Sequence, residues 1–121
     1  MSAEPAFDWV QAASLLGDDP QQVPDDMAEI VRELVDGATQ QFQELKAKNA
    51  GTDRKEISSL AHQLRGCLLN FGFTEVGAIL LHIEGSGYAT NEYPGLVDDA
   101  AEVFVASKKL LANRYPTLNL S

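Results

Sequence analysis

The chain has 121 residues, of which 45% are hydrophobic and 22% are charged, a composition typical of one soluble globular domain. Its 9 Lys and Arg against 18 Asp and Glu give a net charge of −9, and without a basic cluster this argues against nucleic acid as a partner. The apolar runs are far shorter than the ~20 residues of a membrane helix, and the N-terminus lacks the basic and apolar regions of a signal peptide, so we expect a cytoplasmic protein without a membrane partner.

Apolar side chains recur at helical spacing through nearly the whole chain. Residues 7–16 predict a short helix that stops at the turn signals of residues 17–20. Residues 24–48 carry one apolar stripe at steps of three and four, which predicts a long amphipathic helix with Pro24 in its first turn.

A second long helix is predicted over residues 53–71. Asp53 followed by Glu56 resembles a capping box at its start, and Gly72 is suited to its C-terminal end.

Two further apolar stripes, over residues 73–85 and 94–113, complete the pattern, and no segment alternates with the period of a strand. The sequence therefore predicts an all-α fold, an antiparallel four-helix bundle with residues 7–16 as a short N-terminal capping helix. We expect residues 1–121 to form a single domain, with the bundle core at about residues 24–114.

His62 is the candidate reactive residue. An α-helix turns by about 100° per residue, so His62 lies about 140° from the core direction set by Ile57 and is expected to face solvent. Arg65, one turn later, shares that face. Gly66 costs a helix interior roughly 1 kcal/mol relative to alanine, and it would let another protein approach the imidazole. Leu69 would add an apolar contact to the same docking patch.

Glu84 falls about 60° from the centre of the next helix's apolar stripe, at the edge of the seam between helices. Two interpretations stay open: a carboxylate that only reaches solvent, or one that accepts the Nδ1–H of His62 and leaves Nε2 outward as a nucleophile. His82 falls on the far side and is interpreted as a plain surface residue. Cys67, the single cysteine, lies in an apolar stretch and is predicted to be a small buried residue without a disulfide.

The segment from Ala61 to Gly72 resembles the signature of histidine-containing phosphotransfer (HPt) domains, A-H-x-L-K-G, then small or apolar residues, then a glycine that ends the helix. The matching positions are His62, Leu64, Gly66 and Gly72. Residues 7–9 are similar to the family's opening helix, and residues 80–84 to its L-x-x-L-E segment, so the resemblance covers most of the chain.

Three positions depart from the family's pattern. Arg65 stands where lysine is usual and keeps the positive charge on a planar guanidinium. Cys67 stands in place of a smaller residue. Phe73 replaces a common alanine, which we expect to alter the rim of the docking face.

The resemblance implies a phosphorelay intermediate. His62 would take a phosphoryl group from a receiver-domain aspartate of a hybrid sensor histidine kinase and pass it to the receiver domain of a response regulator. Arg65 would balance the phosphoryl charge, Glu84 would orient His62, and Gly66 and Leu69 would form the receiver docking face. Mg²⁺ would belong to the receiver, so we expect no cofactor or metal here. We expect a monomeric phosphocarrier, not an autonomous enzyme, and the initial Met favours a free-standing protein over a domain of a hybrid kinase.

One alternative is an HPt-shaped helical interaction module without phosphotransfer, and phosphorylation of His62 by a receiver distinguishes the two. A carboxylate-bridged metal bundle needs a glutamate three residues before each histidine, but Ser59 and Ile79 stand there. The glycines at 85 and 87 follow a helix and lack the further glycines of a nucleotide-binding loop.

Overall fold

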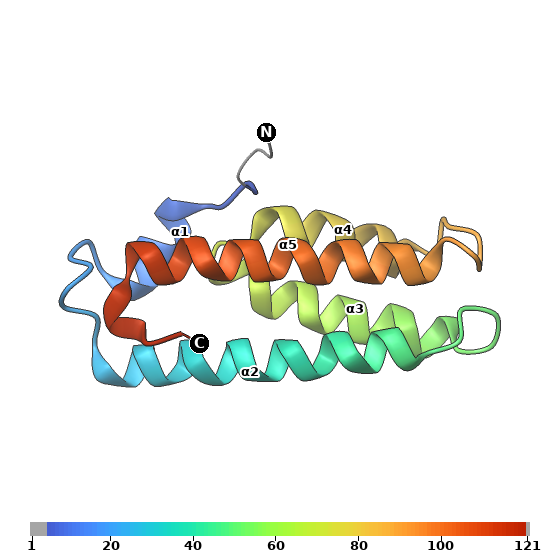
Figure 1. Cartoon of the computed structure of the whole chain (residues 1–121), viewed down its shortest axis with the longest axis horizontal. Coiled ribbons are helices and arrows are strands. Elements are labelled where there is room, and N and C mark those ends of the chain that lie inside the picture. The colour runs from blue at the N-terminus through green and yellow to red at the C-terminus, as the bar shows by residue number, and fades with distance from the viewer. Residues whose placement is uncertain (1–4, 121) are drawn as a thin grey trace.

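The computed structural model describes residues 5–120, and all regular elements in this range are helical. They are α1 (Trp9–Leu16), α2 (Asp25–Ala47), α3 (Arg54–Leu69), α4 (Thr74–Gly85), α5 (Tyr93–Arg114) and a 3₁₀ turn at Pro116–Leu118. In Figure 1 α2 and α5 lie in front of α3 and α4, and α1 lies beside the C-terminal end of α5. The four long helices alternate in direction, so the predicted antiparallel four-helix bundle with a short N-terminal helix is confirmed.

The helix boundaries lie close to those predicted, but two N-terminal details differ. Pro24 is the N-cap residue of α2 and does not belong to its first turn. The predicted capping box is wrong, because Asp53 is the N-cap of α3 without a side-chain capping bond. Its Oδ2 instead accepts the Asn49 N–H at 2.9 Å, and Glu56 pairs with Lys48 at 2.9 Å. Both carboxylates therefore bind the preceding turn.

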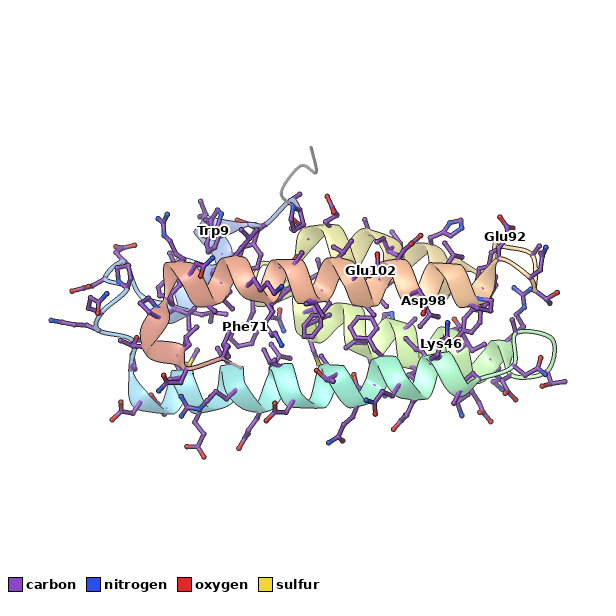
Figure 2. All side chains as sticks on the ribbon, in the orientation of Figure 1. Trp9, Lys46, Phe71, Glu92, Asp98 and Glu102 are labelled. Carbon is purple, nitrogen blue, oxygen red and sulfur yellow. The ribbon has the colours of Figure 1, made fainter. Side chains whose placement is uncertain are left out.

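The core of the bundle runs along its whole length and is filled from all four long helices. A chain of aromatic rings crosses it: Phe7 lies 5.1 Å from Phe73, Phe73 lies 5.6 Å from Phe104, and Phe104 lies 5.3 Å from Phe42, between centroids. Phe71 also points between the helices (Figure 2). Such ring pairs contribute roughly 0.5–1.5 kcal/mol each beyond their buried area. Phe73 is fully buried, so the prediction that it alters a docking rim is wrong.

The N-terminal segment is attached to the turn between α3 and α4. Asp8 caps α1 by accepting the Gln11 N–H at 3.0 Å, and its own N–H donates to the carbonyl of Gly72 at 2.8 Å. Gly72 has a φ of +95°, and a Cβ there would lie 2.5 Å from the Asp8 carbonyl oxygen. This turn therefore requires glycine for both its backbone conformation and its close contact with the N-terminal segment.

Arg54 joins the two loops at the opposite end of the bundle. Its guanidinium donates to the carbonyls of Ala50 at 2.6 Å, Ser86 at 3.2 Å and Tyr88 at 3.1 Å. It also lies over the Tyr88 ring, 4.3 Å from the centroid. The α3–α4 pair that carries His62 and Glu84 is thus tied down at both ends. None of the helices described over residues 5–120 has the length and apolar character needed to span a bilayer.

Candidate functional site

His62 lies on the solvent side of α3. The opposite side of this helix is buried through Ile57, Ala61, Leu64 and Leu68, and the helical period that buries these residues turns His62 outward. Its side chain is 65% exposed. The ring is therefore open to a second protein while its helix is fixed by the core.

The neighbouring helix brings Glu84 to this ring. Ile83 is fully buried in α4, and the next residue lies at the edge of the α3–α4 seam with 20% of its side chain exposed. Ser58, one turn before His62 on α3, donates its hydroxyl to the Glu84 backbone carbonyl at 2.9 Å. The Glu84 carboxylate then reaches the ring, with Oε1 2.5 Å from Nδ1 of His62. Of the two interpretations left open by the sequence, the contact with His62 is the one observed.

Arg65 lies on the same carboxylate. Its Nε and Nη2 are each 3.0 Å from Oε2 of Glu84, and Nη2 is 3.5 Å from Nδ1 of His62. The Arg65 side chain is 24% exposed. His62, Arg65 and Glu84 thus form one connected cluster, with Arg65 on the Nδ1 side of the imidazole.

The charge state of Glu84 decides which ring nitrogen carries the proton. Partial burial raises the pKa of the Glu84 carboxyl, but hydrogen bonds from His62 and Arg65 outweigh this and lower its pKa below the ordinary 4.5. The carboxylate is therefore ionised at neutral pH and can only accept hydrogen bonds. Its contact with Nδ1 requires a proton on Nδ1, which leaves the lone pair of a neutral ring on Nε2.

Gly66 and Leu69, the predicted docking residues, differ in their surroundings. A Cβ added to Gly66 would meet nothing within 4 Å, so the surface beside His62 is open at this position. Leu69 is half-buried, and its Cδ2 would lie 2.6 Å from a Cβ added to Gly77 of α4. Leu69 is therefore only partly exposed on this face, because part of its side chain covers Gly77.

Cys67 and His82 lie outside the cluster. Cys67 is exposed, which corrects the prediction that it is buried. His82 is exposed on α4, and its ring centroid lies 6.3 Å from that of Tyr88. This agrees with its interpretation as a surface residue.

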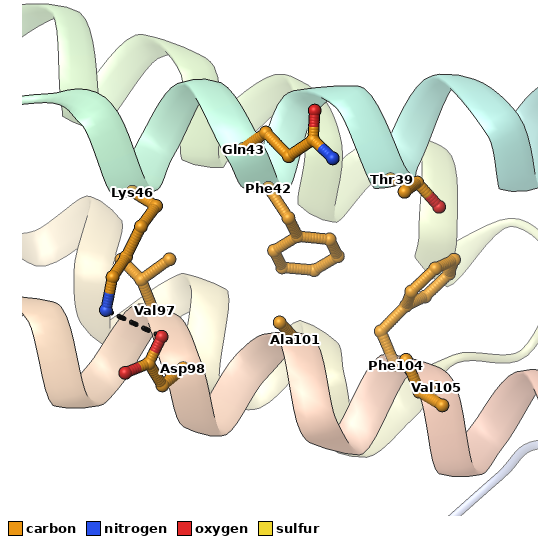
Figure 3. Close-up of a pocket in the computed structure, with 9 residues that line it drawn as sticks. All are labelled: Thr39, Phe42, Gln43, Lys46, Val97, Asp98, Ala101, Phe104 and Val105. Carbon is orange, nitrogen blue, oxygen red and sulfur yellow. Dashed lines mark hydrogen bonds and ion pairs between the residues drawn. The ribbon is translucent and has the colours of Figure 1, made fainter.

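A groove on another part of the bundle lies away from the cluster. This groove of about 260 Å³ lies between α2 and α5, where it is lined by the small side chain of Ala101 and by the rings of Phe42 and Phe104 (Figure 3). Lys46 and Asp98 form an ion pair of 2.7 Å at its rim. No lining residue belongs to α3 or α4, so the groove is separate from His62. Over residues 5–120 no group of three His, Cys, Asp or Glu side chains is arranged to hold a metal ion.

Ser58 is the one contributor to this geometry that the sequence analysis missed. Its position one turn before His62 was the available signal, since residues four apart in a helix lie on the same face. The hydrogen-bond partner of Ser58 could not be predicted from the sequence, because its hydroxyl donates to a backbone carbonyl of another helix.

A protein-family model matches the part of the chain that contains this cluster. The model of the Hpt domain matches residues 21–109, a range that contains His62, Arg65 and Glu84 and runs from just before α2 into α5. The match begins after α1, so the similarity of residues 7–9 to the family's opening helix stays a prediction. Comparisons with curated proteins and with solved structures gave no match. Because the family model covers most of the chain, this protein belongs to the Hpt domain family, whose members serve in histidine phosphotransfer in phosphorelays.

Proposed function

We propose that His62 is the residue that carries the phosphoryl group. It would receive the group from the receiver-domain aspartate of a hybrid sensor histidine kinase and donate it to the receiver domain of a response regulator. The observation that carries the proposal is the contact of the ionised Glu84 with Nδ1 of an exposed imidazole. This contact supports a ring whose Nε2 lone pair points away from the protein.

The chemistry at Nε2 is a displacement at phosphorus. The lone pair of the neutral ring attacks the phosphorus of an aspartyl phosphate, an N–P bond forms, and the P–O bond breaks with its electron pair going to the aspartate. Phosphoryl transfer depends mostly on positioning and on charge stabilisation. The receiver would supply Mg²⁺ and the aspartate, and this chain would supply a nucleophile on a rigid helix. It is therefore proposed to be a carrier without activity of its own.

The surface around His62 is suited to a protein partner. Gly66 lies one turn from His62 with open space above it, and the exposed part of Leu69 lies a further turn along α3. A receiver must bring its phosphorylated aspartate within bonding distance of Nε2, which a bulky side chain at Gly66 would hinder. We propose this strip of α3 as the receiver docking face.

The test is transfer of a labelled phosphoryl group from phosphorylated receiver domains to the full chain. We expect label on the wild-type protein and none on His62→Ala, which should fold normally because substitutions at exposed sites usually change stability by less than about 0.5 kcal/mol. His82→Ala is the matched control, since this histidine is also exposed on a bundle helix, and it should be labelled like the wild type.

Two outcomes would reject the proposal. Label that persists in His62→Ala would place the acceptor at another residue. Receivers that bind the wild-type chain but never label it would favour the alternative, a helical interaction module that keeps the HPt shape without phosphotransfer.

A further inference from the structure

Glu84 is held by α3 at two points, its backbone carbonyl and one carboxylate oxygen, and its other carboxylate oxygen contacts His62. Ser58 binds its backbone carbonyl, and two nitrogens of Arg65 converge on Oε2 at 3.0 Å. Oε1 is the oxygen left for Nδ1 of His62. The rotamer of Glu84 is thus fixed by the same helix that carries the histidine.

We propose that Arg65 and Glu84 together keep a proton on Nδ1 of His62 in both the free and the phosphorylated states, with Arg65 as a positioning residue for Glu84. This inference rests on the proposed phosphorylation of His62. It assigns Arg65 a role other than direct balance of the phosphoryl charge. The guanidinium lies on the Nδ1 side of the ring, and its Nε and Nη2 are both engaged with the Glu84 carboxylate.

The retained proton matters for the second transfer. Attack by Nε2 with Nδ1 still protonated gives a ring with an N–P bond at Nε2, an N–H at Nδ1 and a formal positive charge. A carboxylate at Nδ1–H stabilises such an imidazolium, as in catalytic triads. When the next aspartate attacks phosphorus, the N–P bond breaks, its electron pair returns to Nε2, and neutral imidazole leaves. No proton is taken up or released in either step.

Loss of the Nδ1 proton from the phosphorylated ring would make onward transfer harder. The ring would then have to leave as imidazolate, an anion and a much poorer leaving group than neutral imidazole. The Glu84 carboxylate therefore favours the form of the phosphorylated ring that gives up its phosphoryl group readily.

Arg65 stabilises the charge and the rotamer of Glu84, which the position of Glu84 in α4 does not favour. Glu84 lies in the last turn of α4, where the helix dipole disfavours a negative charge. A glutamate without a partner would also gain rotamer freedom by turning to solvent. The guanidinium offsets both tendencies, since it brings a positive charge and two donors to one oxygen.

The experiment measures the protonation of Nδ1 directly. The full chain is phosphorylated with phosphoramidate, which needs no docking, and the ¹⁵N chemical shifts of the His62 ring are recorded at mildly alkaline pH. We expect a protonated Nδ1 in the labelled and unlabelled wild type. In Glu84→Gln and Arg65→Met the labelled ring should lose this proton, and transfer to a receiver should slow roughly tenfold, the change that about 1.4 kcal/mol of barrier produces.

Two further variants separate positioning from general charge effects. Arg65→Lys keeps a cation that can pair with Glu84 and should restore a protonated Nδ1. Lys55→Met removes a positive charge from the same helix two turns before His62, and it should behave like the wild type.

Three results would overturn the inference. A labelled wild-type ring with a bare Nδ1 would do so while leaving His62 as the phosphoryl acceptor. A protonated Nδ1 in Arg65→Met, combined with slow transfer from receivers, would make Arg65 a ligand of the phosphoryl group or of the receiver. Absence of label on His62 would instead reject the proposed function, and this inference with it.

Discussion

Substitutions of Gly66 test two separate effects of this glycine: the stability that α3 loses by having a glycine there, and the open surface that it leaves beside His62. A glycine in a helix interior is about 1 kcal/mol less favourable than alanine. A Cβ at Gly66 would meet nothing within 4 Å, so no clash reduces the gain. Gly66→Ala should therefore raise the free energy of unfolding by about 1 kcal/mol and the melting temperature by roughly 4 °C, as measured by thermal and urea denaturation.

Gly37 provides the matched control. It lies within α2, and a Cβ there would also meet nothing within 4 Å. Gly37→Ala should stabilise the protein by a similar amount and leave phosphotransfer unchanged. A loss of stability in Gly66→Ala alone would show that the surface beside His62 is not open.

The functional half of the prediction uses a larger side chain. Gly66→Leu should fold at least as stably as the wild type, because leucine is a good helix former, but transfer from a receiver should fall more than about tenfold, which corresponds to roughly 1.4 kcal/mol. Labelling by phosphoramidate should be unaffected, since that donor is small. A Gly66→Leu protein that accepts phosphate from a receiver at the wild-type rate would refute the docking face, even with His62 as the acceptor.

Three other substitutions test the surroundings of the cluster. Gly72→Ala should lower the free energy of unfolding by about 2 kcal/mol or more, and by more than Gly17→Ala, because Gly17 has a similar positive φ but open space around it. Leu69→Glu should slow transfer from receivers without changing phosphoramidate labelling, whereas Val105→Glu, on the exposed α2–α5 side, should not slow it. The lowered pKa of Glu84 adds stability that is fully present above the ordinary value of 4.5 and is lost as pH falls through the folded value. The stability difference between wild type and Glu84→Gln should therefore shrink in acid denaturation below pH 4.5.

The helices were predictable because each buries one side. An apolar stripe at helical spacing is sufficient to place a helix and its direction of burial, and this is why the outward direction of His62 followed from the apolar stripe that begins at Ile57. The contact between His62 and Glu84 was predictable only as one of two possibilities. A helical wheel places a side chain at the edge of a seam, but the seam's width depends on how closely the two helices pack.

Cys67 shows that a helical wheel does not predict burial at the edge of a seam between helices. Cys67 and Arg65 each lie about 80° from Ile57, on opposite sides of the α3 wheel. Arg65 is half-buried because α3 packs closely against α4, whereas Cys67 is exposed on the side where α3 makes fewer contacts, with α2. The two residues are nearly equivalent on the wheel, so only the unequal spacing of the neighbouring helices distinguishes them.

The net charge of the whole chain and the local charge around His62 lead to different expectations about the approach of a phosphoryl group. The chain carries a net charge of −9, which by itself would repel a phosphoryl group and an acidic receiver site. At the cluster, however, the Arg65 cation is paired with the Glu84 anion beside the His62 ring. At a separation of more than about 8–10 Å, exposed charges are largely screened at physiological salt. Under the proposed function, a phosphoryl group on His62 would therefore lie beside an Arg65–Glu84 pair without net charge, and the charge balance of the transfer would depend on what the receiver brings.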